Sequence, residues 1–228
     1  VVFGADGGLS ADIDVSNLDG TDGFTILANA NDISALGYSI AGGGDFNGDG
    51  LDDLIIGAPA ASYGQTNAAG EVYVVFGSTD PFVAGTDVGT LVANNQAIVI
   101  EGEDVFARFG EAVDFAGDFN GDGLDDIIVG APDADGAGEA YIIFGSAGLA
   151  PRTLLDDLVG GTAAIASTGC AASDALGQAV SGAGDVNGDG LDDVIVGAPY
   201  NNYAGNNGGA AFVIFGTQAP VDVDTSLL

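Results

Sequence analysis

Several residue types that carry catalysis or bind polyanions are scarce or missing in this chain. Its 228 residues include no His, one Cys and only 2 Lys plus Arg against 34 Asp plus Glu, for a formal net charge of −32. Such a chain cannot neutralise phosphates, so nucleic acid is rejected as a partner, and an anionic membrane surface is disfavoured. No apolar run is long enough to span a bilayer, so we expect no direct membrane insertion.

The missing His also limits the chemistry. A nucleophilic triad cannot form in its usual way, and general acid–base work would fall to carboxylates. The acidic groups Asp156-Asp157 and Glu101/Glu103-Asp104 are interpreted as solvated loop charge rather than as a hydrolytic pair. We therefore predict that the protein is not an enzyme.

The single Cys and the two Arg residues are expected to have structural rather than functional roles. Cys170 has no partner for an intrachain disulfide and is expected to be a small, inert residue in a Gly/Ala/Ser-rich stretch. Arg108 and Arg152 are expected to form local salt bridges rather than to clamp an anion.

The residues that are abundant indicate a folded protein. Hydrophobic residues make up 47% of the chain, which is too many for a disordered acidic tail. Apolar strands joined by acidic loops fit this composition. Bound divalent cations would relieve part of the repulsion between so many carboxylates.

One nine-residue segment occurs three times. The residues of Asp45–Asp53 return almost unchanged at 118–126 and at 185–193, so the copies start 73 and 67 residues apart. Oxygen-bearing side chains stand at positions one, three, five and nine, and a Gly for a sharp turn stands at position six. A backbone carbonyl at position seven would complete a set of hard oxygen ligands.

That donor set suits Ca²⁺, which accepts many oxygen ligands at flexible angles. We predict three calcium sites, one in each loop. Their ligands are Asp45, Asn47, Asp49, Leu51 and Asp53 in the first loop, Asp118, Asn120, Asp122, Leu124 and Asp126 in the second, and Asp185, Asn187, Asp189, Leu191 and Asp193 in the third. Asp52, Asp125 and Asp192, at position eight, are expected to be solvated or to support the ligands, and the Leu side chains to face the core.

Two other interpretations of the loops are weaker. An EF-hand or dockerin-type loop places its last carboxylate at position twelve and then enters a helix, whereas position twelve here is Ile56, Val129 or Val196 within a β-branched run. Asp/Asn/Gly-rich segments also form ordinary turns, but three near-identical copies argue against a turn alone.

Each repeat reads as four short strands. A segment that starts with Leu-Gly or Phe-Gly runs into the loop, a β-branched run ends in Gly-Ala-Pro, a third strand ends in Phe-Gly, and a weaker fourth strand follows at Ala97–Glu101 and 163–166. No segment shows helical periodicity. The chain is therefore predicted to be all-β, with β-propeller blades of four antiparallel strands.

The ends of the chain are out of phase with these blades. Residues 1–35 are expected to supply the third and fourth strands of a partial blade, at Val1–Gly4 and Phe24–Leu27. Residues 36–108 and 109–175 are expected to form whole blades, and residues 176–228 a blade without a clear fourth strand, for which only Val221–Leu228 remain. Because the chain opens within a strand, without Met or a signal peptide, we expect a processed product or a fragment of a longer protein.

The order of these motifs resembles the FG-GAP repeat of integrin α-subunit propellers, especially bacterial members in large secreted surface proteins. The resemblance implies a seven-bladed propeller with calcium in the hairpin loop between the first two strands of a blade. Seven blades lie within the known range of blade counts, and seven such repeats need roughly 470 to 510 residues. This chain has about half of that number of residues.

The resemblance leads to a functional expectation. We expect a calcium-binding extracellular module, secreted or on the cell surface, for adhesion or for protein or glycan interaction. Its partners would be a ligand on the loop face or neighbouring blades of the same or another chain. The alternatives are a structural subunit of an extracellular filament or surface layer, and a non-catalytic propeller attached to an extracellular hydrolase.

Overall fold

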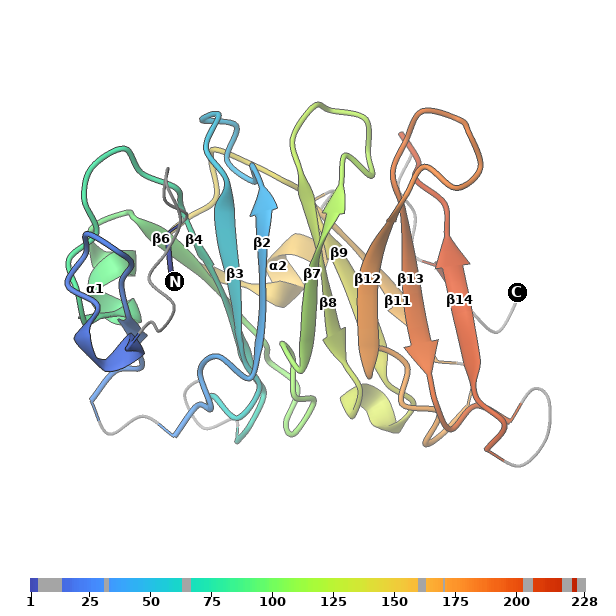
Figure 1. Ribbon diagram of the computed structural model, residues 1–228. Helices are drawn as coiled ribbons and strands as arrows, with labels where there is room; N and C mark the ends of the chain where they lie inside the picture. Colours follow the sequence, from blue (N-terminus) through green and yellow to red (C-terminus); the bar gives the residue numbers. More distant parts are fainter. Residues whose placement is uncertain are drawn as a thin grey trace.

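The computed structural model describes residues 1–3, 14–30, 33–62, 67–159, 163–169, 171–202, 207–218 and 223–224, the last pair through the backbone alone. Within these residues the sheets are stacked side by side along the molecule, each with its strands running across the stack (Figure 1). This arrangement is a partial β-propeller, so the predicted fold class is confirmed.

Three sheets act as blades, in which consecutive strands pair antiparallel in chain order. The first strands of the three blades contact one another, so each blade packs directly on the next. The first blade contains β2 (Ser39–Gly44), β3 (Asp53–Ala58), β4 (Glu71–Val75) and β6 (Ala97–Glu101); the second contains β7 (Ala112–Gly117), β8 (Asp126–Ala131), β9 (Glu139–Ile143) and β11 (Ala164–Thr168); the third contains β12 (Ala179–Gly184), β13 (Asp193–Ala198) and β14 (Ala210–Ile214).

Apolar residues on both faces of each blade form the core. Successive side chains of a strand point to opposite faces, so Ile127 packs into the cluster shared with the first blade and Ile128 into the cluster shared with the third. This two-sided burial explains why the central strands are continuous apolar runs rather than alternating ones. Both isoleucines are fully buried.

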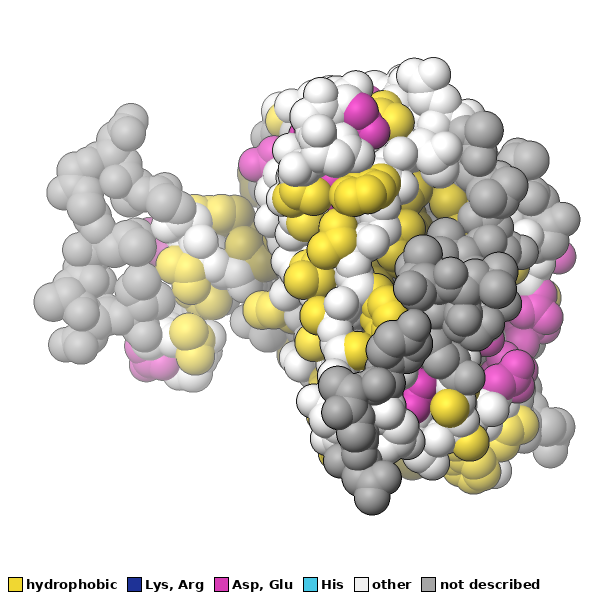
Figure 2. All heavy atoms as spheres, turned by 90° about the vertical axis from the view of Figure 1, so that its right-hand side faces the viewer, with side chains coloured by type: hydrophobic (Ala, Val, Ile, Leu, Met, Phe, Trp, Pro, Cys, Tyr) yellow, Lys and Arg dark blue, Asp and Glu magenta, His cyan; other side chains and the backbone are white. Residues whose placement is uncertain are grey.

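The outer face of the third blade remains apolar but exposed. Ile195 corresponds in register to the buried Ile128 and is 37% exposed, and Val213 and Phe215 beside it are 42% and 55% exposed. Figure 2 shows hydrophobic side chains in columns along this side of the molecule. The face therefore has the character of a surface that another blade would cover.

The N-terminal segment pairs with the segment expected to follow it in a blade. Val2 forms an antiparallel bridge with Gly23, and Phe3 donates its backbone N–H to the carbonyl oxygen of Asp22 at 2.8 Å. The same antiparallel pairing joins β4 to β6 in the first blade. The borders drawn at residues 35/36, 108/109 and 175/176 stay a prediction.

Two helical segments that show no periodicity in the sequence accompany the strands. Two short helices precede the fourth strands of the first two blades, and they are too short to reveal a period in the sequence. Asp87 caps the first of these helices by accepting the N–H of Thr90 at 2.9 Å. The apolar side chains of this helix complete the core beside β6. The helical segments are α1 (Val88–Ala93), α2 (Leu155–Val159), and the 3₁₀ turns η1 (Val15–Asn17) and η2 (Ala134–Gly136).

A parallel fifth strand also extends the blades beyond the expected four. The strand that leads into each helix pairs with the outer strand of the preceding sheet, so the chain of one blade reinforces its neighbour. Thus β10 (Arg152–Leu154) pairs with β6, and β5 (Thr86–Asp87) pairs with β1 (Ile26–Leu27).

The C-terminal strand follows the same rule. β15 (Val223–Asp224) pairs in parallel with β11 of the second blade. The third blade was predicted to lack a clear fourth strand, and the described part of the segment that remained for one is a fifth strand of the second blade.

Candidate metal centre

The three Asp-rich loops lie at the same edge of the stacked blades. Each joins the first and second strand of a blade, so that the loops follow one another along the top of the molecule in Figure 1. A β-bulge interrupts the first strand just before each loop, for example between Gly42 and Gly44. A bulge bends the strand and redirects the following side chains, here the Asp at position one.

In the first loop, the carboxylate at position one organises the turn. Asp45 accepts the N–H groups of Gly48 at 2.8 Å, Asp49 at 3.0 Å and Gly50 at 2.8 Å. Its side chain therefore lies on the inner side of the loop. Gly50 has φ 86°, as its place at position six predicts.

The other predicted side-chain ligands turn the same way. Asn47 accepts the N–H of Asp49 at 2.9 Å, and Asp49 accepts the N–H of Leu51 at 2.9 Å. The third loop repeats all the bonds of the first, with Asp185, Asn187 and Asp189 as acceptors. The second loop repeats them with Asp118, Asn120 and Asp122, except for the bond from the Gly at position four.

The carboxylate at position nine is fully buried in every loop. The Oδ1 of Asp53 accepts the N–H of Gly77 at 2.8 Å, and its Oδ2 accepts the N–H of Phe46 at 3.0 Å. Asp193 makes the equivalent bonds with Val186 and Gly216. Asp126 accepts the N–H of Gly145 in the same way, but its Oδ2 accepts the N–H of Asn120, at position three of the loop. Position nine thus connects the loop to the end of the third strand.

Burial strongly affects the charge of these groups. Burial, together with the nearby carboxylate of Asp49 or Asp122, raises the pKa of Asp53 to about 6 and that of Asp126 to about 7, although hydrogen bonds from backbone N–H groups oppose the shift. The chain's two arginines form ion pairs elsewhere. A cation held in the loop would supply the missing positive charge.

The donor set fits a hard divalent cation by its chemistry, since it contains only carboxylate, amide and carbonyl oxygens. Within the described residues, however, no three His, Cys, Asp or Glu side chains are arranged to hold a metal ion. The ligand positions and the calcium ions stay a proposal.

Position seven differs from the expectation that its Leu faces the core. The three Leu side chains are only half-buried. A Cβ added to Gly48 would lie 2.7 Å from the Cδ2 of Leu124, so this Leu packs against the loop of the preceding blade. Leu191 packs in the same way against Gly121 of the second loop.

Both arginines have the roles that the sequence predicts. Arg108 pairs with Glu111 at 2.5 Å and with Asp133 at 3.4 Å, and Arg152 pairs with the buried Glu101. Each pair is local to a blade junction. Cys170 lies outside the described residues.

One polar cluster was not predicted from the sequence. Glu111 is 6% exposed, and its Oε1 accepts hydrogen bonds from Tyr38 at 3.1 Å and from Gln178 at 3.4 Å. These three residues follow the Leu-Gly or Phe-Gly of their repeats, so the cluster joins the starts of three blades. Their shared position was the available signal, but their side chains differ in type.

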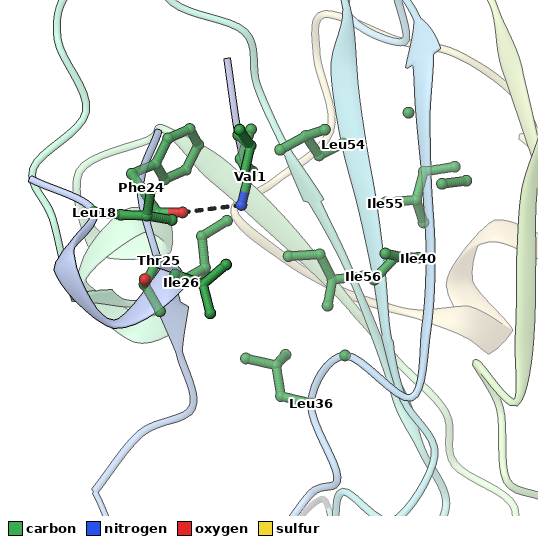
Figure 3. A pocket seen from close by; sticks show the side chains of 15 residues that line it. Val1, Leu18, Phe24, Thr25, Ile26, Leu36, Ile40, Leu54, Ile55 and Ile56 are labelled. Atoms are coloured by element: carbon green, nitrogen blue, oxygen red, sulfur yellow. Dashed lines mark hydrogen bonds between the residues drawn. The ribbon is translucent and has the colours of Figure 1, made fainter. Parts of the chain in front are cut away.

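A cavity of about 690 Å³ separates the N-terminal segment from the first blade (Figure 3). Val1 and Phe24 line one side and are linked by a hydrogen bond of 2.9 Å, and Ile40, Leu54 and Ile56 line the other. Among the described residues that line it, no side chain is charged. Its lining resembles the apolar clusters between the other blades more than a polar ligand site.

The FG-GAP repeat family matches the chain three times, at residues 36–75, 109–143 and 176–214, which together make up half of the chain. Each match contains one Asp-rich loop and the strands on both sides of it. The chain belongs to the FG-GAP repeat family and has an integrin α-like β-propeller fold.

Integrin α chains and one phospholipase are among its relatives. The chain is 35% identical to "Integrin alpha pat-2" of Caenorhabditis elegans over 165 residues (68% of this chain, 12% of the relative). It is 29% identical to "Integrin alpha-5" of Xenopus laevis over 199 residues (78% and 17%). It is 33% identical to "Phosphatidylinositol-glycan-specific phospholipase D" of Bos taurus over 185 residues (78% and 20%).

The chain thus spans a small part of each relative, from 12 to 20% of the length. In the described residues, no helix has the length and apolar character needed to cross a membrane.

Proposed function

We propose that the chain is a non-catalytic, calcium-stabilised part of an extracellular propeller that acts in adhesion. The observation that carries the proposal is the threefold loop, in which inward-facing carboxylates meet a fully buried Asp without any basic partner. The names of the integrin relatives support an adhesion role, and the donor chemistry supports calcium.

The bound cation would act on blade packing. Calcium would supply the positive charge that allows the carboxylates of one loop to stay ionised at close range. In the first loop, Phe46 stands between the ligand Asp45 and the ligand Asn47, and its side chain is buried between the first and second blades. A fixed loop would therefore hold Phe46 in the junction, and Phe119 occupies the same place in the next junction.

The ligand-contacting loop face is proposed to be formed by the connections between second and third strands, at the opposite edge of the blades from the Asp-rich loops. The connections between second and third strands, at residues 60–69, 132–137 and 200–207, are polar and differ among the repeats. Such variation suits recognition of a protein or a glycan. Tyr200, 52% exposed at the start of the third connection, is one candidate contact.

Calcium titration tests the proposal. Isothermal titration of the metal-free chain is expected to show three binding events per chain, with a dissociation constant near ~0.1 mM, as in extracellular modules. Binding of the calcium-loaded chain to protein and glycan arrays, lost in chelator, would then identify the ligand class. Calcium-independent folding together with no calcium uptake would refute the proposal.

One alternative function has support from a relative. The phospholipase D match is consistent with a propeller attached to an extracellular hydrolase. Hydrolytic activity in the longer protein, from a domain outside residues 1–228, would favour it. A filament or surface-layer subunit, in which other chains cover the exposed apolar face, is distinguished by calcium-dependent self-assembly.

A further inference from the structure

The residue at position eight of a loop contacts the loop of the preceding blade. The Oδ2 of Asp125 accepts the backbone N–H of Asp45 at 2.7 Å, and the N–H of Asp125 donates to the carbonyl of Asp45 at 3.2 Å. Asp192 makes the same two bonds with Asp118, at 2.9 and 3.3 Å. The contact therefore recurs at both described junctions between whole loops.

Other contacts keep the same two loops in register. Ser146, just after the third strand of the second blade, donates its N–H to the carbonyl of Phe46 at 2.8 Å. Thr217 does the same for Phe119 at 2.9 Å. The first two residues of the first loop and of the second loop are thus held by the next blade.

We propose that Asp125 and Asp192 are positioning residues for the cation loops of the preceding blades. The inference rests on the proposed function, because it concerns calcium affinity at those loops. Neither residue needs to touch the cation: each carboxylate holds the backbone of the position-one Asp, whose own carboxylate is the proposed ligand.

The loop at which calcium affinity falls most distinguishes a positioning role of Asp125 from a loss of negative charge alone. Asp125 belongs to the second loop in sequence, next to the proposed ligand Asp126. Loss of its negative charge alone would weaken calcium binding most strongly at the second loop. Loss of its bond to Asp45 weakens binding most strongly at the first loop, although that loop is 80 residues away in the chain.

The first loop offers a matched control. Asp52 has the same position-eight place and charge, but it is exposed, and the described residues hold no Asp-rich loop before it. Asp52→Ala therefore removes one charge close to the first loop without removing a bond to another calcium loop.

The test is a calcium titration of ¹⁵N-labelled chain, in which each loop is followed by its own amide resonance. Gly50, Gly123 and Gly190 are suitable probes because each donates its N–H to the position-one carboxylate of its loop, at 2.8, 3.1 and 3.0 Å. The variants are Asp125→Ala, Asp125→Asn and Asp52→Ala.

Asp125→Ala is expected to weaken calcium binding at Gly50 by roughly tenfold or more, the usual effect of losing a group that orients a ligand. Its effect at Gly123 is expected to be smaller, as is the effect of Asp52→Ala at Gly50. Asp125→Asn keeps an acceptor oxygen and is expected to recover part of the affinity. If Asp125→Ala does not fold, Asp125→Asn against Asp52→Asn provides the same comparison.

The outcomes are separable. A larger loss at Gly123 than at Gly50, or an equal loss at Gly50 in Asp125→Ala and Asp52→Ala, would overturn the positioning role while calcium binding stands. No calcium response at any of the three probes in the unaltered chain would overturn the proposed function and this inference with it.

Discussion

The carboxylate of Asp53 and the backbone N–H of Gly77 are 2.8 Å apart, and this bond joins the Asp-rich loop to the end of the third strand. Asp126 and Asp193 bind Gly145 and Gly216 in the same way, at 2.8 and 2.9 Å. The Gly of the Phe-Gly signature is therefore part of the candidate metal centre, although it stands 19 to 24 residues after the loop.

Gly145→Ala is expected to lower stability by about 1–3 kcal/mol, the usual effect of overpacking. A Cβ at this position would lie 2.7 Å from the Cβ of Leu124 and 2.7 Å from the carbonyl oxygen of Asp125, so the loop would have to move. Thermal melting in calcium measures the loss. Gly148→Ala is the control, because its Cβ would meet only the Oγ of Ser146 at 3.7 Å; equal losses in both variants would contradict the account.

Removal of calcium is expected to lower the melting temperature sharply. At ~10 mM calcium and a dissociation constant near ~0.1 mM, each site adds about 2.7 kcal/mol. Three independent sites would add roughly 8 kcal/mol, which is comparable to the net stability of an ordinary domain. Melting curves with calcium and with excess chelator measure this difference.

A single-site variant provides the control for the chelator experiment. Asp49→Ala should remove about one third of the calcium-dependent shift, because it alters one loop only. An unchanged melting curve in excess chelator would refute the stabilising role of calcium.

The metal-free chain is expected to lose stability as the pH rises from about 4 to about 7. The folded pKa values of Asp53 and Asp126, about 6 and about 7, lie above the ordinary value for Asp. Between the unfolded and folded pKa values the folded chain binds more protons, so its stability decreases with increasing pH. Calcium favours the ionised carboxylates and should oppose this loss.

Melting temperatures at pH 4.5 and pH 7.5, with calcium and with chelator, test this prediction. Asp126→Asn cannot ionise and should flatten the dependence in chelator. A metal-free chain that is more stable at pH 7.5 than at pH 4.5 would show that these two carboxylates do not dominate.

The sequence predicted the blade strands and the Asp-rich hairpins because their signals are local. Apolar runs end at Gly, Pro, Asn and Asp, and position twelve within a strand already excluded a helical exit from the loop. The propeller architecture could also be predicted, because the same motifs occur three times in the same order.

The remaining features depend on contacts between repeats. Asp125 resembles any solvated acid until the second loop is placed beside Asp45. Leu124 likewise shows its role only against Gly48. The helices α1 and α2 are held by apolar contacts with neighbouring strands, and six or five residues give no readable period.

Residues 1–228 expressed alone in calcium are expected to self-associate, because the outer face of the third blade exposes Ile195, Val213 and Phe215. Phe215→Glu should reduce the mass measured by light scattering. Val83→Glu, at a residue that is 74% exposed in a loop near the first blade, should leave the mass unchanged. A cooperatively folding monomer without any substitution would show that this face tolerates water.

The most direct test of the account is a crystal structure of the chain grown in calcium. Three calcium ions are expected, one per loop, with calcium–oxygen distances of about 2.3–2.6 Å. In the first loop the ligands should be Asp45, Asn47, Asp49, the carbonyl of Leu51 and Asp53. Loops without calcium under these conditions, or coordination through Asp52 in place of Asp53, would contradict it.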